Sequence, residues 1–233
     1  MSMITENVAQ IRSRIAAAAR AAGRDPADIR LCAATKMNDS AAVREAIAAG
    51  VDCCGENRVQ ELVKKLDEHA YDGAPVHFIG ALQRNKVGQV DVIESVDRRE
   101  LLADINAEAA KRGIVQDILL EVNAGGEKQK SGFLLKEFPR IVEEMADYPA
   151  VRVRGLMTVP PIGRKKGDNC RYFQKIRRIA VDITAQKYDN IFMDFLSMGM
   201  TDDFEDAIAC GSTMVRIGTA IFGPRNYAPV KSD

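Results

Sequence analysis

The regular alternation of strand-like and helix-like runs constrains the fold of this chain more than any other feature. Short apolar runs predict eight strands, at 31–36, 51–56, 76–80, 92–96, 117–123, 151–157, 191–197 and 214–218. Helix-like segments follow them, at 41–49, 58–68, 84–90, 99–112, 135–147, 170–186, 203–209 and 219–222. Strands that alternate with helices are joined by right-handed crossovers and form a parallel sheet.

Eight such units predict an α/β fold, a single (β/α)8 TIM barrel that spans residues 1–233 as one domain. Ahead of the first strand, Ile4, Val8, Ile11, Ile15 and Ala19 recur at spacings of three and four, which predicts an extra N-terminal helix over 4–22. A doubly wound open sheet is the main alternative. It is disfavoured because no G-x-G-x-x-G follows the first strand.

Charge and cysteine usage exclude several classes of function. Lys and Arg total 33 and Asp and Glu total 33, so the balanced charge argues against binding to nucleic acid or to a membrane surface. The first residues lack the apolar core of a signal peptide, and no apolar run is long enough to span a membrane. Five cysteines without a C-x-x-C, and only two histidines, indicate reduced thiols and no metal site in a cytoplasmic protein.

The carboxyl ends of the predicted strands carry the polar residues and glycines. In a barrel these ends form the face on which active sites lie. They read Lys36, "GEN" at 55–57, "HFIG" from His77, Asn123, "GLMT" at 155–158, "LSMGMTDD" at 196–203 and "VRIGTAIFG" at 215–223. The strand bodies stay apolar, so we expect a functional rim at this end of the barrel.

Three features of this rim together favour a phosphorylated aldehyde as ligand. Lys36 ends the first strand and offers an amine, although a lysine there also reaches water easily. Ser197, and Gly218 with Thr219, begin the turns after the last two strands. Free backbone N–H groups in such turns attract an anion. The alternative is that these residues only make tight turns. Arg216 shares a strand face with Met214. Pyridoxal 5′-phosphate (PLP) needs an amine, phosphate donors and a partner for its ring nitrogen.

At these residues the chain resembles the pyridoxal phosphate homeostasis protein family, nearly end to end. The resemblance is carried by "ATK" at 34–36, "GENRVQE" at 55–61, "HFIGALQRNK" at 77–86, "KSGF" at 130–133, "RGLMTVP" at 154–160 and "SMGMTDDFEDAIACGSTMVRIGTAIFG" at 197–223. It implies a barrel similar to the N-terminal domain of alanine racemase, with PLP held as a Schiff base on Lys36. The phosphate would be bound by Ser197, Gly218 and Thr219, and Arg216 would face the pyridine nitrogen.

The same resemblance implies a carrier or buffer of the cofactor, active in vitamin B6 homeostasis, rather than an enzyme. An arginine keeps the ring nitrogen unprotonated, which makes the ring a weak electron sink. Racemases supply a second acid/base from an appended β-domain, which we do not expect here. The partners would be PLP and, transiently, the apo forms of PLP enzymes, with the chain as a monomer.

Three alternatives stay open at this stage. The first is a small PLP-dependent amino-acid racemase whose second acid/base is His77 or Cys54. The second is a Schiff-base aldolase without a cofactor, and the third is an inert scaffold with Lys36 as a rim residue. Asn57 is predicted to contact the cofactor or its Lys36 linkage, unless it only begins a helix. Lys130 is a secondary candidate in a loop.

Overall fold

The computed structural model describes residues 2–81, 87–163 and 165–224. The helices are α1 (Met3–Ala21), α2 (Ser40–Ala48), α3 (Val59–Asp67), α4 (Arg99–Arg112), α5 (Phe138–Glu144), α6 (Cys170–Thr184), α7 (Phe204–Ala209) and α8 (Thr219–Phe222). The strands are β1 (Arg30–Ala34), β2 (Cys53–Glu56), β3 (Val76–Phe78), β4 (Val92–Val96), β5 (Gln116–Asn123), β6 (Phe133–Leu134), β7 (Val151–Met157), β8 (Ile191–Ser197) and β9 (Met214–Ile217).

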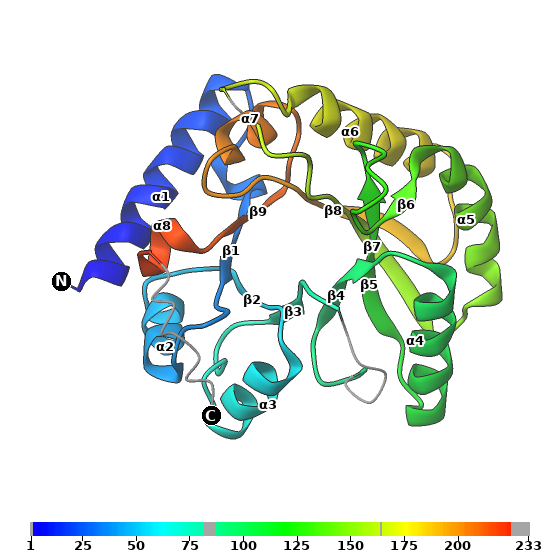
Figure 1. Cartoon of the computed structure of the whole chain (residues 1–233), viewed down its shortest axis with the longest axis horizontal. Coiled ribbons are helices and arrows are strands. Elements are labelled where there is room, and N and C mark those ends of the chain that lie inside the picture. The colour runs from blue at the N-terminus through cyan, green and yellow to red at the C-terminus, as the bar shows by residue number, and fades with distance from the viewer. Residues whose placement is uncertain (1, 82–86, 164, 225–233) are drawn as a thin grey trace.

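Parallel pairing closes the sheet into a barrel. The strand order is β4-β3-β2-β1-β9-β8-β7-β5, and a further pairing of β4 with β5, in which Ile93 faces Ile118, joins the two ends. Figure 1 shows this ring of strands face-on, with the helices around its outside. The predicted (β/α)8 barrel is therefore confirmed, and the open-sheet alternative is wrong. The two-residue β6 pairs with β5 at the rim and was not predicted.

The predicted helix over 84–90 is wrong where it can be compared. Residues 87–90 form turns, while 84–86 lie outside the described residues. Gly88 has φ +79°, a left-handed conformation that a helix does not contain, and its N–H donates to the side chain of Gln116 at 2.9 Å. The predicted helix over 135–147 is also interrupted, because one-turn 3-10 helices at Leu135–Glu137 and Met145–Asp147 flank α5.

Helix α1 covers the outside of the barrel beside its last unit. It buries Val8, Ile11, Ile15 and Ala19, the apolar positions on which the N-terminal helix was predicted. These side chains share a core cluster with residues of β1 and β9, and α1 packs against α2, α7 and α8. Because α8 has only four residues, α1 supplies the apolar cover that a full-length eighth helix would provide.

Alternation along the strands separates the interior of the barrel from its outer wall. Along β1, Leu31 and Ala33 belong to the cluster beneath α1, whereas Cys32 belongs to a cluster drawn from the inward faces of seven strands. That interior cluster contains Cys32, Cys53, Val92, Leu119, Met157, Phe195 and Met214. Continuing the period of two from Cys32 places Ala34 and then Lys36 toward the barrel axis.

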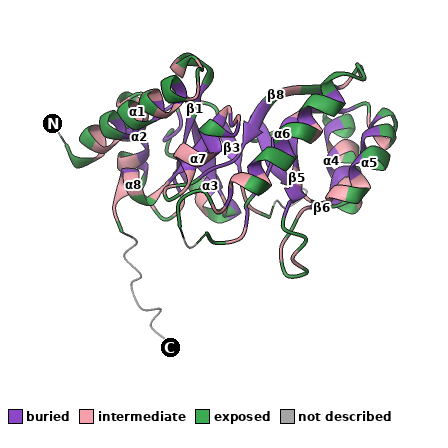
Figure 2. Cartoon of the chain, turned by 90° about the horizontal axis from the view of Figure 1, so that it is seen from above, coloured by how far each residue is buried: buried purple, intermediate pink, exposed green. Residues whose placement is uncertain are grey.

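Burial follows the same division (Figure 2), with buried strands at the centre and helices exposed on their outer faces. All five cysteines are free, and four of them are buried. Of the helices that the structure describes, none is long and apolar enough to cross a membrane.

Replacement of Gly155 by alanine should be far more damaging than replacement of Gly113. Both glycines have positive φ, +152° and +66°. A Cβ at Gly155 would lie 1.9 Å from the backbone oxygen of Phe195 on the paired strand β8, whereas a Cβ at Gly113 meets nothing within 4 Å. We expect Gly155→Ala to lower the free energy of unfolding by more than about 3 kcal/mol, and Gly113→Ala by about 1 kcal/mol. Urea unfolding measures the stability of both variants, and equal losses of stability would contradict the predicted backbone clash at Gly155.

Candidate functional site

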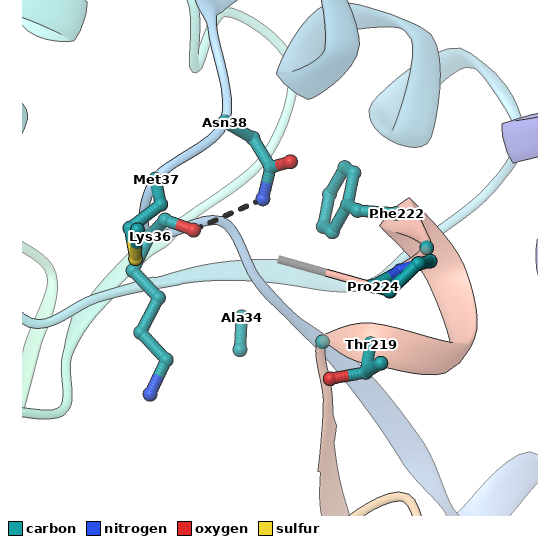
Figure 3. A pocket seen from close by; sticks show the side chains of 9 residues that line it. Ala34, Lys36, Met37, Asn38, Thr219, Phe222 and Pro224 are labelled. Carbon is teal, nitrogen blue, oxygen red and sulfur yellow. Dashed lines mark hydrogen bonds between the residues drawn. The ribbon is translucent and has the colours of Figure 1, made fainter. Parts of the chain in front are cut away.

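Lys36 lies at the carboxyl end of β1, in a pocket at the mouth of the barrel. The pocket is lined by Ala34, Lys36, Met37, Asn38, Gly218, Thr219, Phe222, Gly223 and Pro224. In Figure 3 the Lys36 chain extends past Ala34, and the Thr219 hydroxyl points from the opposite wall toward the same space. Lys36 is half-buried and Thr219 is exposed. The structure therefore brings together the predicted amine and the predicted turn at Gly218 and Thr219.

A continuous chain of polar side chains lies below this pocket, inside the barrel. Glu94 on β4 is fully buried, and its two oxygens bond to different partners. Nδ1 of His77 lies 2.6 Å from one oxygen, and the hydroxyl of Ser197 donates to the other at 2.6 Å. Nη1 of Arg216 donates to the Ser197 hydroxyl at 2.6 Å and lies 3.9 Å from Glu94. One carboxylate thus links a histidine, a serine and an arginine from three other strands.

The charged groups of this network stabilise one another's ionised forms. Burial alone would lower the pKa of His77, but the hydrogen bond to Glu94 and the charge of that carboxylate raise it above its ordinary value. Burial alone would raise the pKa of Glu94, but the hydrogen bond and charge of His77, together with the charge of Arg216, hold it below its ordinary value. The geometry therefore favours an ionised Glu94 between two cations.

Hydrogen bonds hold the guanidinium of Arg216 in one orientation and use only some of its N–H groups. Nη1 also donates to the backbone oxygen of Ser197 at 2.7 Å, and Nη2 donates to the backbone oxygen of Thr158 at 3.0 Å. Among the described residues these contacts, with the Ser197 hydroxyl, engage three of the five N–H groups of a guanidinium. The remaining donors suit an acceptor atom such as a ring nitrogen.

The two strand ends predicted to bind an anion differ from one another. After β9, Gly218 and Thr219 line the pocket beside Lys36. After β8, Ser197 is fully buried, and its hydroxyl is engaged by Glu94 and Arg216. Two backbone donors beyond it are also engaged, since the N–H of Met198 donates to the oxygen of Met214 at 3.1 Å and the N–H of Met200 donates to the side chain of Asp203 at 2.7 Å. A direct contact from Ser197 to a phosphate stays a prediction, and the geometry gives Ser197 an orienting contact to Arg216.

Asn57 follows β2 as Lys36 follows β1, because Ala34 and Gly55 are paired in the sheet. It is half-buried, and its Oδ1 is buried without a hydrogen-bond partner among the described residues. A buried amide oxygen without a donor is costly, so a ligand that donates there would be stabilised. Asn57 does not line the pocket of Lys36 and Thr219, so its contact with a ligand stays a prediction that this orphaned acceptor supports.

The other candidates lie outside this pocket. Cys54 faces outward from β2 into the cluster beneath α3, and burial raises the pKa of its thiol to about 12. His77 is buried in the barrel and bonded to Glu94. Lys130 donates to the backbone oxygen of Pro160 at 2.8 Å and pairs with Glu127 at 3.0 Å. Lys130 thus ties together two loops of the rim and does not line the pocket of Lys36.

Comparison with known proteins shows which family this chain belongs to. The family model "Alanine racemase, N-terminal domain" matches residues 6–226. The pyridoxal phosphate homeostasis protein of Aquifex aeolicus is 41% identical, with 95% of this chain and 98% of that protein covered. The protein of the same name from Escherichia coli K12 is 40% identical, with 98% and 99% covered. The chain belongs to the pyridoxal phosphate homeostasis protein family.

A solved relative supports the assignment. PipY of Synechococcus elongatus, whose structure was determined with PLP bound, is 30% identical to this chain with a TM-score of 0.80. The comparison covers 94% of this chain and all of PipY, at 100%. The resemblance inferred from the sequence motifs is therefore confirmed for the fold and for the family.

Two carboxylates of this homeostasis-family barrel were missed by the sequence analysis. Glu94 interrupts the apolar strand "VIESV", two positions after the inward-facing Val92, and this alternation could have indicated a buried interior charge. Glu121 lies two positions after Leu119 on β5. Burial and the charge of Asp97 raise the pKa of Glu121 to about 7, although the charge of Arg216 acts to lower it. The sequence analysis missed both residues because it searched for functional side chains only at the carboxyl ends of the strands.

The stability of the His77–Glu94 pair should depend on pH with a defined sign. The raised pKa of His77 makes its contribution complete below its ordinary pKa of 6.5 and lost as pH rises through the raised value. The lowered pKa of Glu94 makes its contribution complete above 4.5 and lost in acid. We therefore expect His77→Gln to be most destabilising between about pH 4.5 and 6.5, measured by denaturant unfolding.

His69→Gln is the matched control, because His69 is the only other histidine and its side chain is 80% exposed. It should change stability little at any pH. A stability difference for His77→Gln that is the same on both sides of neutrality would show that the pair is not ionised in the folded protein.

Proposed function

We propose that this protein binds PLP covalently on Lys36 and carries or buffers the cofactor without strong catalysis of its own. The observation that carries the proposal is the pocket in which the Lys36 amine and the Gly218–Thr219 turn face the same space, with the buried Arg216 two residues before Gly218 on β9. The aldehyde of PLP condenses with a lysine amine, with loss of water, to give a Schiff base.

Each part of the cofactor has a candidate partner, either in the lining of the pocket or among the buried side chains of the barrel interior. The backbone and hydroxyl at Gly218 and Thr219 offer donors for the phosphate. The remaining N–H groups of Arg216 offer donors for the pyridine nitrogen. The orphaned Oδ1 of Asn57 is an acceptor for the ring hydroxyl. Contacts from Lys36, Asn57, Ser197, Arg216, Gly218 and Thr219 to the cofactor are all part of this proposal.

The geometry around Arg216 argues for binding rather than turnover. A guanidinium stays protonated and can only donate, so a ring nitrogen facing it stays unprotonated and withdraws electrons weakly. Glu94 and Ser197 hold the guanidinium in place and supply no acid that could protonate the ring. Weak electron withdrawal disfavours the breaking of bonds at a substrate's α-carbon.

The racemase alternative requires a second acid/base next to Lys36. Of the two candidates, Cys54 lies on the outer face of the barrel wall, and His77 is bonded to Glu94 below the pocket. Cys54 therefore points away from the barrel interior, and His77 is already engaged by the carboxylate of Glu94. These placements support a carrier that delivers PLP to apo enzymes over a racemase, and purified protein loaded with PLP should not interconvert D- and L-alanine.

Lys36→Ala should abolish the yellow colour that the protein acquires with PLP, because Lys36 is the one lysine among the described residues that line the pocket. Visible absorbance after incubation and dialysis measures the bound cofactor, and borohydride reduction with peptide mapping locates it. Lys130→Ala is the control and should remain yellow, because Lys130 contacts Pro160 and Glu127 instead. A reduced adduct on any lysine other than Lys36 would overturn the assignment, and a protein that never turns yellow would favour the aldolase or scaffold alternatives.

Thr219→Val should weaken the binding of PLP by about tenfold or more and leave the binding of pyridoxal unchanged. The substitution keeps the shape of the side chain and removes a hydroxyl donor, and a hydrogen bond to a charged group contributes about 1.5–3 kcal/mol. Titration by visible absorbance with each aldehyde gives both affinities. An equal loss for pyridoxal, which has no phosphate, would place the phosphate elsewhere.

A further inference from the structure

Helix α3 contacts the backbone on both sides of Lys36. On the side that precedes Lys36, Nζ of Lys65 donates to the backbone oxygen of Thr35 at 2.8 Å. On the side that follows it, Oε2 of Glu61 accepts from the N–H of Met37 at 2.6 Å. Glu61 and Lys65 are four residues apart on α3, so one helix face makes both contacts.

Lys65 belongs to a small buried cluster of charges. Its residue is only 4% exposed, and its ammonium pairs with Glu56 and lies 3.6 Å from Glu61. The Thr35 hydroxyl donates to the same oxygen of Glu56 at 2.8 Å. A buried ion pair of this kind adds little to stability compared with apolar side chains of similar size. Its geometry is better explained by what it holds, which is the carbonyl and the hydroxyl of Thr35.

The contact of Glu61 holds an unusual backbone. Met37 has φ +63°, a left-handed conformation that is unfavourable for a residue with a Cβ atom. The Met37 N–H in this conformation points to Glu61, and the side-chain amide of Asn38 donates to the backbone oxygen of Lys36 at 3.0 Å. Side chains therefore support this turn in addition to its own backbone bond, in which the N–H of Asn38 donates to the oxygen of Thr35 at 3.2 Å.

From these contacts we propose that Glu61 and Lys65 are positioning residues that fix the direction in which Lys36 enters the pocket. This inference rests on the proposed function of Lys36. Neither residue lines the pocket, so both act through the backbone of Thr35 and Met37. Reaction of an amine with an aldehyde depends steeply on the placement of the two atoms. Loss of either contact should therefore slow formation of the covalent adduct and leave the noncovalent contacts of the cofactor unaffected.

The test compares PLP with pyridoxine 5′-phosphate, which carries an alcohol in place of the aldehyde and cannot react with Lys36. Glu61→Ala removes the acceptor for Met37, and Glu61→Gln restores an oxygen at that place. We expect Glu61→Ala to slow adduct formation by about tenfold or more, and Glu61→Gln to recover most of the rate. Binding of pyridoxine 5′-phosphate, measured by calorimetry, should stay within about twofold for both.

Lys65 needs a paired substitution, because removing it alone leaves Glu56 as an uncompensated buried charge and endangers the fold. Glu56→Gln combined with Lys65→Met removes both charges and should also slow adduct formation. Lys64→Met is the matched control, since Lys64 is the neighbouring lysine of α3 and its side chain is 74% exposed. That control should react as the wild type does.

The outcomes separate this inference from the proposed function. A wild-type protein that forms no adduct on Lys36 would overturn the proposed function. With a reactive wild type, an unchanged rate in Glu61→Ala would overturn the positioning role. So would an equal loss of pyridoxine 5′-phosphate binding, because a general loosening of the pocket affects both ligands.

Discussion

Hydrogen bonding between β4 and β5 closes the sheet, and this closure decides which residues of the chain meet. In a closed parallel sheet every second side chain points to one axis, and all carboxyl ends open on one face. Lys36 and Gly218 reach the same pocket because β1 and β9 are neighbours in the ring, although the two residues lie at opposite ends of the sequence. The hydroxyl of Ser197 on β8 donates to Glu94 on β4 across the interior, although these two strands are not neighbours. In an open sheet of the same strand order β1 and β9 would still be adjacent, but this bond between β4 and β8 would be lost.

The interior of the barrel combines an apolar cluster with a buried charged network. Cys32, Leu119 and Phe195 belong to the apolar cluster, whereas Glu94, His77 and Arg216 form the buried charged network. Removing such charges from water costs more than most ion pairs return. A barrel selected for stability alone would fill this space with branched apolar residues. The buried charges are therefore consistent with the proposed role of Arg216 as a donor to a ligand.

The sequence analysis succeeded where local pattern and topology decide the answer. Apolar runs predicted all the strands of the ring, and the motifs at their ends predicted Lys36, Gly218 and Thr219, which do line one pocket. It failed at 87–90, where the left-handed Gly88 and its bond to a distant glutamine make turns. It also failed to find Glu94 and Lys65, since their roles depend on partners contributed by other elements. Ser197 was identified at the correct strand end, but its bonds to Glu94 and Arg216 depend on packing that one strand does not reveal.

The proposed carrier role requires both capture and release of a cofactor, and the two walls of the pocket differ in a way that suits it. The wall at β1 is rigid, because bonds from α3 and Asn38 fix the backbone around Lys36. The opposite wall is a short turn, at which Thr219 is exposed to solvent. An enzyme excludes water from such a site to protect reactive intermediates. If Lys36 holds the cofactor as proposed, the linkage would lie in the same pocket as this exposed turn, and the water that hydrolysis needs would reach it from there.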